Sequence, residues 1–122
     1  IAREKFSVSP EREKAFDMVR QFYVLVDNHF KEKKMVQDYA DMLHRSPKTL
    51  SNLFTTCGLP SPLRIIHERI EAEAKRLLLY SQKSAKEITE ILGFEDQATF
   101  SRFFKKMTGE SVSEYRKREK RE

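Results

Sequence analysis

Apolar residues recur along this chain at steps of three and four, the spacing that places side chains on one face of an α-helix. Over no comparable length do apolar and polar residues alternate as they do in a strand. The pattern therefore predicts an all-α protein. The stripes are Phe16, Val19, Tyr23, Val26 and Phe30; Val36, Tyr39, Ala40 and Leu43; Leu50, Leu53, Phe54 and Cys57; Ile66, Ile70, Ala74, Leu77 and Leu78; Ala85, Ile88 and Leu92; and Phe100, Phe103, Phe104 and Met107.

Capping residues indicate where the helices begin and end. Ser9, Ser46 and Ser61 each precede a proline, which suits an N-cap followed by the first helical position. Ser84 and Ser111 each stand three residues before a glutamate, the spacing of a capping box. With stops at Gly58, Gly93 and Gly109, these signals predict seven helices, at about 10–31, 36–43, 47–57, 62–80, 85–92, 96–107 and from 112 onwards.

The chain repeats itself at an offset of 50 residues. Residues 49–54 (Thr-Leu-Ser-Asn-Leu-Phe) align with residues 99–104 (Thr-Phe-Ser-Arg-Phe-Phe), and each copy follows a short amphipathic helix and a tight turn. This order is typical of the helix-turn-helix, whose second helix can lie in the major groove of DNA. We therefore expect two homeodomain-like helix-turn-helix subdomains, 16–60 and 82–116, joined by a long helix within 61–81. Residues 1–15 are the expected lead-in and residues 117–122 a basic tail.

Acidic residues are missing from two windows of the chain, 42–67 and 97–109. The net charge of +5 is a poorer guide, because the stretch 116–122 with its five bases and two acids contributes +3 of it. That end either touches phosphates or is a frayed, solvated terminus. Ordinary solvated helix faces mix acids and bases, whereas a face that meets a polyanion avoids carboxylates. The two windows therefore indicate nucleic-acid binding.

The candidate DNA-binding residues lie opposite the apolar stripe on the second helix of each pair. Arg102 suits guanine O6 and N7, and Asn52 and Gln97 suit adenine N6 and N7. The lysines and the hydroxyl side chains suit phosphate oxygens. The expected contacts are Lys48, Thr49, Ser51, Asn52 and Thr55 in the first recognition helix and Gln97, Ala98, Thr99, Ser101, Arg102, Lys105 and Lys106 in the second.

A longer pattern in the second half of the chain comprises Ala74, Leu77, Leu78, Lys86, Glu87, Ile88, Gly93, Phe94, the run 100–106, Gly109, Tyr115 and Arg116. With this pattern, the chain resembles the DNA-binding domain of AraC/XylS-type transcriptional regulators from about Phe16 to Arg116. The resemblance implies a seven-helix fold, binding of double-stranded promoter DNA, and activation of transcription by contact with RNA polymerase. It also implies an N-terminal effector-binding or dimerisation domain, in keeping with a start at Ile1 and not at Met.

Some positions depart from that family's pattern. Thr89 stands where alanine is usual and Val112 where proline is usual, and Gly58 lies one residue early. Ala98 occupies a position that is often polar in the family. This recognition helix is therefore expected to contact fewer base edges there, or a thymine methyl group.

Other classes of function are weaker. No nucleophile–base pair, glycine-rich phosphate loop or paired-carboxylate motif stands out, so we expect neither enzymatic activity nor a cofactor. His29, His44 and His67 share no ligand spacing, which predicts no metal site, and Cys57 on its apolar stripe predicts a buried structural thiol.

Two further alternatives concern partners. A helical protein-interaction module, with the acid-free face against an acidic partner protein, stays open. RNA binding is less favoured, because the aromatic residues belong to the core pattern. The longest apolar run, residues 77–80, is far too short for a membrane span, so a cytoplasmic location is expected.

Overall fold

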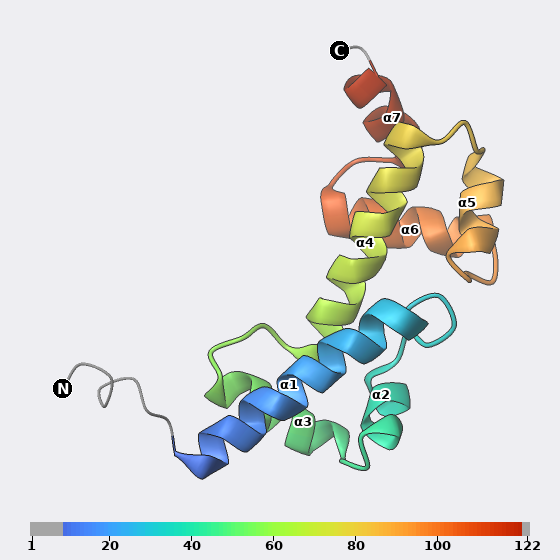
Figure 1. Cartoon of the computed structure of the whole chain (residues 1–122). Helices are drawn as coiled ribbons and strands as arrows, with labels where there is room; N and C mark the ends of the chain where they lie inside the picture. The colour runs from blue at the N-terminus through green and yellow to red at the C-terminus, as the bar shows by residue number, and fades with distance from the viewer. Residues whose placement is uncertain (1–8, 121–122) are drawn as a thin grey trace.

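The computed structural model describes residues 9–120, and within that range the chain forms seven α-helices (Figure 1). They are α1 (Pro10–His29), α2 (Val36–Met42), α3 (Pro47–Thr56), α4 (Pro62–Tyr80), α5 (Ala85–Ile91), α6 (Gln97–Thr108) and α7 (Val112–Lys120). The predicted all-α fold is confirmed for these residues. The first eight residues of the expected lead-in and the last two of the basic tail lie outside the described range.

The helices begin at the caps that the sequence indicates. The hydroxyls of Ser9, Ser46 and Ser61 accept the backbone N–H three residues further on, at 3.1–3.2 Å. At α5 the Glu87 N–H donates to Ser84 Oγ (3.1 Å) and the Ser84 N–H donates to Glu87 Oε1 (2.8 Å). The same exchange opens α7. Each cap satisfies end amides that the helix itself leaves without an acceptor.

Helix α4 is the central helix of the fold, and all six other helices pack against it. Figure 1 shows α1, α2 and α3 gathered at its beginning and α5, α6 and α7 around its later half. Within these groups α2 packs on α3 and α5 packs on α6, which gives two helix-turn-helix pairs. Buried side chains from both groups, including Leu50, Phe54, Phe100 and Phe104, and Ile70 of α4 belong to one continuous apolar cluster.

The buried face of α1 differs from the predicted one. Tyr23 is 41% exposed, whereas Phe22 is fully buried. Phe22 contacts Tyr39 at 5.5 Å between ring centroids and meets Phe54 edge-on at 4.9 Å. Positions 22 and 23 both continue a stripe that starts at Val19, and these aromatic partners select the first.

Residues 117–120 of the expected basic tail are helical and not frayed, because helix α7 continues through them. Arg118 Nη2 lies 2.6 Å from Glu110 Oε1 and its guanidinium lies 5.3 Å from the centroid of the Tyr115 ring. The expected boundary at 116 therefore falls inside a helix. At the end of α3, Cys57 is half-buried against the core and not fully buried.

Candidate nucleic-acid interface

Helix α3 separates its apolar and polar residues cleanly. Leu50 and Phe54 are buried and hold the helix against α1 and α4. The five predicted contact residues of this helix, Lys48, Thr49, Ser51, Asn52 and Thr55, are all exposed. The first turn of α3 carries no acidic residue. The exposed face therefore presents hydroxyl, amide and ammonium groups without a carboxylate.

Two of these side chains are already engaged with the helix. Ser46 Oγ donates to Thr49 Oγ1 at 2.9 Å, and Thr55 Oγ1 donates to the Ser51 carbonyl at 3.0 Å. In this rotamer Thr55 offers an outside group only its acceptor lone pairs. Among residues 9–120, by contrast, the side chains of Lys48, Ser51 and Asn52 form no hydrogen bond, and their donors are free to bind another molecule.

Helix α6 presents the second predicted set. Its buried face is Phe100 and Phe104. Gln97, Ala98, Arg102, Lys105 and Lys106 are exposed, whereas Thr99 and Ser101 are half-buried. Their hydroxyls therefore sit at the edge of the exposed face. Arg102, at its centre, has one long contact, from Nη2 to Thr99 Oγ1 at 3.4 Å.

Asp96 is the acidic residue closest to this face along the chain, directly before the acid-free window. It is the N-cap of α6, and its Oδ1 accepts the Thr99 N–H at 2.8 Å. The Thr99 backbone and hydroxyl, and the nearby charge of Arg102, lower the pKa of Asp96. The carboxylate is thus committed to the helix end and stays ionised near neutral pH.

The two lysines near the end of α6 lie on different sides of it. Lys106 shares a surface hollow of about 420 Å³ with Arg64, His67 and Glu68 of α4. Burial and the charge of Lys106 lower the pKa of His67. Lys105 instead acts on the start of α7, where its charge contributes to lowering the pKa of Glu114. Lys106 therefore flanks the exposed face and Arg102 lies within it.

The turns of the two pairs match in backbone conformation but not in residue type. In each pair, the residue that follows the C-cap of the first helix has a positive φ. This residue is His44 (φ +57°) in the first pair and Gly93 (φ +77°) in the second. Positive φ is unfavourable for histidine and free for glycine, so a glycine marks the second turn in the sequence, whereas the first turn is predicted only from the end of the apolar stripe and from the next cap. Arg45, next to His44, is exposed just before α3 and lies inside the first acid-free window, but it does not belong to the predicted contact set.

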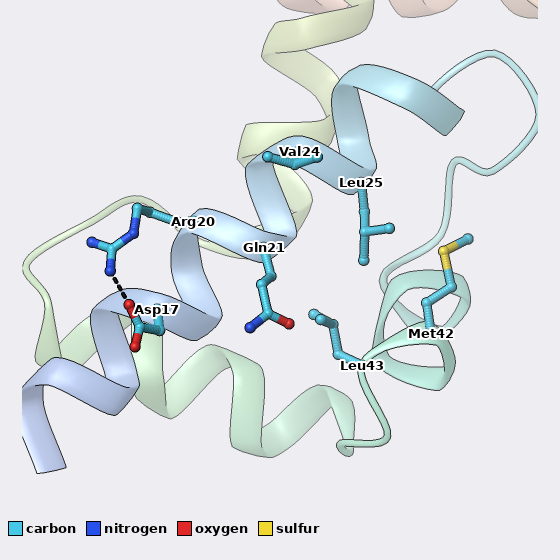
Figure 2. A pocket seen from close by; sticks show the side chains of 7 residues that line it. All are labelled: Asp17, Arg20, Gln21, Val24, Leu25, Met42 and Leu43. Atoms are coloured by element: carbon cyan, nitrogen blue, oxygen red, sulfur yellow. Dashed lines mark hydrogen bonds and ion pairs between the residues drawn. The ribbon is translucent and has the colours of Figure 1, made fainter.

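Another hollow of the surface lies between α1 and the end of α2. Figure 2 shows its seven lining residues, with Leu25 of α1 pointing toward Met42 and Leu43. Its volume is about 500 Å³, and the Asp17–Arg20 ion pair lies at one end. None of the predicted contact residues lines it. Its apolar lining does not suit a polyanion.

The geometry also bears on metal binding and on membrane crossing. Within the part of the chain that the structure describes, no three His, Cys, Asp or Glu side chains come together as a metal would require. In the same range, no helix combines the length and the apolar character that crossing a membrane demands.

The chain is similar to transcriptional regulators over most of its length. A family model described as "Helix-turn-helix domain" matches residues 39–118. The arabinose operon regulatory protein of Salmonella typhimurium is 36% identical over 92 residues, which cover 75% of this chain and 31% of that protein. An uncharacterized HTH-type transcriptional regulator, YisR of Bacillus subtilis, is 30% identical over 118 residues, 96% of this chain and 40% of the relative.

A solved structure agrees with these relatives. The C-terminal domain of AraT, a response regulator from Geobacillus stearothermophilus, matches with a TM-score of 0.73 at 29% identity. The match covers 82% of this chain and 84% of the AraT domain chain. The chain spans less than half the length of the curated relatives just named. With two helix-turn-helix pairs on one long helix, and with these relatives, the chain belongs to the helix-turn-helix DNA-binding domains of AraC/XylS-type transcriptional regulators.

Proposed function

We propose that this domain binds promoter DNA in a sequence-specific manner, with α3 and α6 inserted in successive segments of the major groove. The observation that carries the proposal is the pair of exposed, acid-free faces, at the same place in two helix-turn-helix units. A solvated helix surface in this protein looks different, as α4 with its Arg64–Glu68 and Glu71–Lys75 ion pairs illustrates.

The length of α4 suits this mode of binding. Its 19 residues correspond to about 28 Å, at a rise of about 1.5 Å per residue. Successive major-groove segments on one side of a duplex lie about 34 Å apart. One chain could therefore contact two segments. Because the exposed residues of α3 and α6 differ, the expected site is asymmetric, with two unlike boxes about one helical turn apart.

Residue roles follow from donor geometry and exposure. Arg102 is proposed to read guanine, Asn52 and Gln97 adenine, and Ala98 a thymine methyl group. The proposed phosphate contacts are Lys48, Thr49, Ser51, Thr55, Thr99, Ser101, Lys105 and Lys106. The half-buried positions of Thr99 and Ser101 suit the edge of a groove, where the phosphates lie.

The wider context is also a proposal. The subdomains are taken as 16–60 and 82–116 with 61–81 between them. The complete protein, as in relatives of which this chain spans 31–40%, is proposed to carry an N-terminal effector-binding or dimerisation domain and to activate transcription through RNA polymerase. It is proposed to act in the cytoplasm, without enzymatic activity of this domain.

Selection of bound duplexes from a random pool tests the central proposal. We expect two conserved boxes about one helical turn apart. Binding of the selected duplex is then measured by fluorescence anisotropy at several salt concentrations, because phosphate contacts make affinity fall steeply with salt. A flat salt response, or tight binding to an acidic polypeptide in place of DNA, would instead favour a protein-interaction module.

Arg102→Ala and Lys106→Ala form a matched pair for the residue roles. Arg102→Ala is expected to cost about 1–3 kcal/mol on the selected duplex and little on a scrambled one. Lys106→Ala is expected to weaken both duplexes alike, because a phosphate contact carries no base information. Equal losses on both duplexes for Arg102→Ala would refute its assignment to a base.

A further inference from the structure

The loop between α1 and α2 touches the turn between α5 and α6, so the two helix-turn-helix units meet directly as well as through α4. The closest point is Gly93. A Cβ atom built there would lie 1.9 Å from the Lys31 carbonyl oxygen and 2.9 Å from Lys34 Nζ. Only a glycine permits that approach. In Figure 1 the end of α1 and its following loop lie beside this turn.

Lys34 bridges the two sides of this contact. Its Nζ donates to the Lys31 carbonyl at 2.7 Å and lies 5.1 Å from the centroid of the Phe94 ring. Burial lowers the pKa of Lys34 below its ordinary value, although the charge of Glu32 opposes the shift. The ammonium group is thus partly removed from water and held between a carbonyl and an aromatic face, where a cation–π contact is stronger than at an exposed site.

Each side of the contact is anchored to a recognition helix. On the second side, Phe94 packs on Phe100 and Phe103 of α6, with ring centroids 5.4 Å apart in both pairs. On the first side, the fully buried Tyr39 donates its hydroxyl to the Lys33 carbonyl at 2.6 Å.

Tyr39 in turn is linked to α3. It packs on Phe22, and Phe22 packs on Phe54 of that helix. A series of contacts therefore runs from one recognition helix to the other, beside the connection through α4. It consists of packed rings and the Tyr39 hydrogen bond on the first side, the backbone from Lys33 to Lys34, and the cation–π contact of Lys34 with Phe94 on the second side.

We propose that Lys34 and Phe94 are positioning residues that hold α3 and α6 in one relative orientation and thereby set the spacing of the two boxes that the domain recognises. We name the contact of residues 31–34 with residues 93–94 the clasp. Its orienting role is independent of any ligand, whereas the consequence for DNA rests on the proposed function.

The clasp matters because B-DNA couples distance to rotation. One inserted base pair moves the second box by about 3.4 Å and turns it by about 35° around the duplex. A domain that cannot adjust loses contacts at one box. A domain whose two units can rotate relative to each other keeps part of these contacts. The energy that it spends is then only the energy needed to bend α4.

Lys34→Met removes the ammonium group and keeps an unbranched chain of similar reach. Lys33→Met is its matched control, because Lys33 is exposed in the same loop and its removal changes the net charge equally. Phe94→Leu removes the aromatic face from the other side. The end of α1 stays attached to α4 in all three, since Arg69 Nε donates to Asp27 Oδ1 at 2.7 Å and the Arg69 guanidinium carbon lies 4.3 Å from the centroid of the Phe30 ring.

The orientation is measured first without DNA. Spin labels are attached at Ser51→Cys and Lys105→Cys, on the exposed side of α3 and of α6, in a Cys57→Ser background, and the distance distribution is recorded by double electron–electron resonance. We expect a narrow distribution in the parent and in Lys33→Met, and a broader one in Lys34→Met and Phe94→Leu. Equal widths in all four would overturn the clasp, because α4 alone would then set the orientation.

The spacing is measured next, on the selected duplex with one or two base pairs inserted between its boxes. The parent and Lys33→Met are expected to lose about tenfold or more in affinity per insertion. For Lys34→Met the loss is expected to shrink by about two- to fivefold, the share that a cation–π contact supplies. An unchanged loss would overturn the role in spacing. Failure to select any duplex would overturn the proposed function, and the resonance widths would then decide alone whether the clasp orients the two units.

Discussion

Replacement of Gly93 by alanine is the most direct probe of the contact between the two units. Gly93 has φ +77°, a region in which a residue with a Cβ is strained. That strain destabilises the folded state by about 1–2 kcal/mol. Alanine also lowers the conformational entropy of the unfolded chain, which offsets less than about 1 kcal/mol of this loss. The added Cβ would also lie 1.9 Å from the Lys31 carbonyl oxygen, so backbone must move apart by about 1 Å.

The chain supplies a control for the strain alone. Gly109 has φ +86° at the end of α6, and a Cβ there would meet nothing within 4 Å. Gly109→Ala is therefore expected to lower the free energy of unfolding by about 1 kcal/mol. Gly93→Ala carries the same strain and an overpacking cost of about 1–3 kcal/mol in addition. The expected total is about 2–4 kcal/mol.

The assay is urea unfolding followed by far-UV circular dichroism, with the free energy extrapolated to water and the slope compared between variants. The informative quantity is the difference between the two alanine variants, because the backbone strain cancels in it. A difference below about 0.5 kcal/mol would refute the reasoning, since it falls short of the overpacking cost. It would mean that Gly93 does not approach the Lys31 carbonyl in solution.

Three further substitutions test other parts of the fold. Tyr39→Phe removes the half-buried hydrogen bond to the Lys33 carbonyl and is expected to cost about 0.5–1.5 kcal/mol of unfolding free energy in urea titrations; no loss would argue against that bond. His44→Gly relieves a positive φ and is expected to raise the melting temperature, whereas a drop would contradict the strained turn. Serine N–H and hydroxyl groups lower the pKa of Glu87 and Glu114 below 4.5, so both caps stabilise the fold above that pH and lose their effect as the pH falls below it. Between pH 3 and 6 the melting temperature is expected to depend less on pH in the double variant Glu87→Gln, Glu114→Gln than in the parent. An identical pH dependence in both proteins would refute this.

Much of the fold follows from short-range pattern in the sequence. Caps such as Ser46 and Ser84 depend on residues three positions away, and the structure forms the hydrogen bonds that the spacing predicts. The repeat at an offset of 50 residues likewise leads directly to the equivalent places of α3 and α6. Local chemistry of this kind does not depend on the rest of the chain.

The features that the sequence did not reveal depend on partners far along the chain. The choice of Phe22 over Tyr23 is made by Tyr39 and Phe54, which no local period includes. The approach of Gly93 to Lys31 joins residues 62 positions apart, and the glycine alone suggests only a helix end. Within the candidate site, the exposure of the polar residues could be predicted from the sequence. The hydrogen bond from the Thr55 hydroxyl to the Ser51 carbonyl of the same helix could not.

The position of α4 in the core has a consequence for how such domains can diversify. Because this helix packs against all the others, a recombination breakpoint within residues 62–80 creates a helix whose two parts come from different proteins. The core side chains of the two parts are then not matched to each other. Exchange of a whole helix-turn-helix unit between relatives thus disturbs the shared core, while single substitutions on the exposed faces of α3 and α6 leave it untouched. New operator preferences in this lineage are therefore expected to arise by point mutation on those faces.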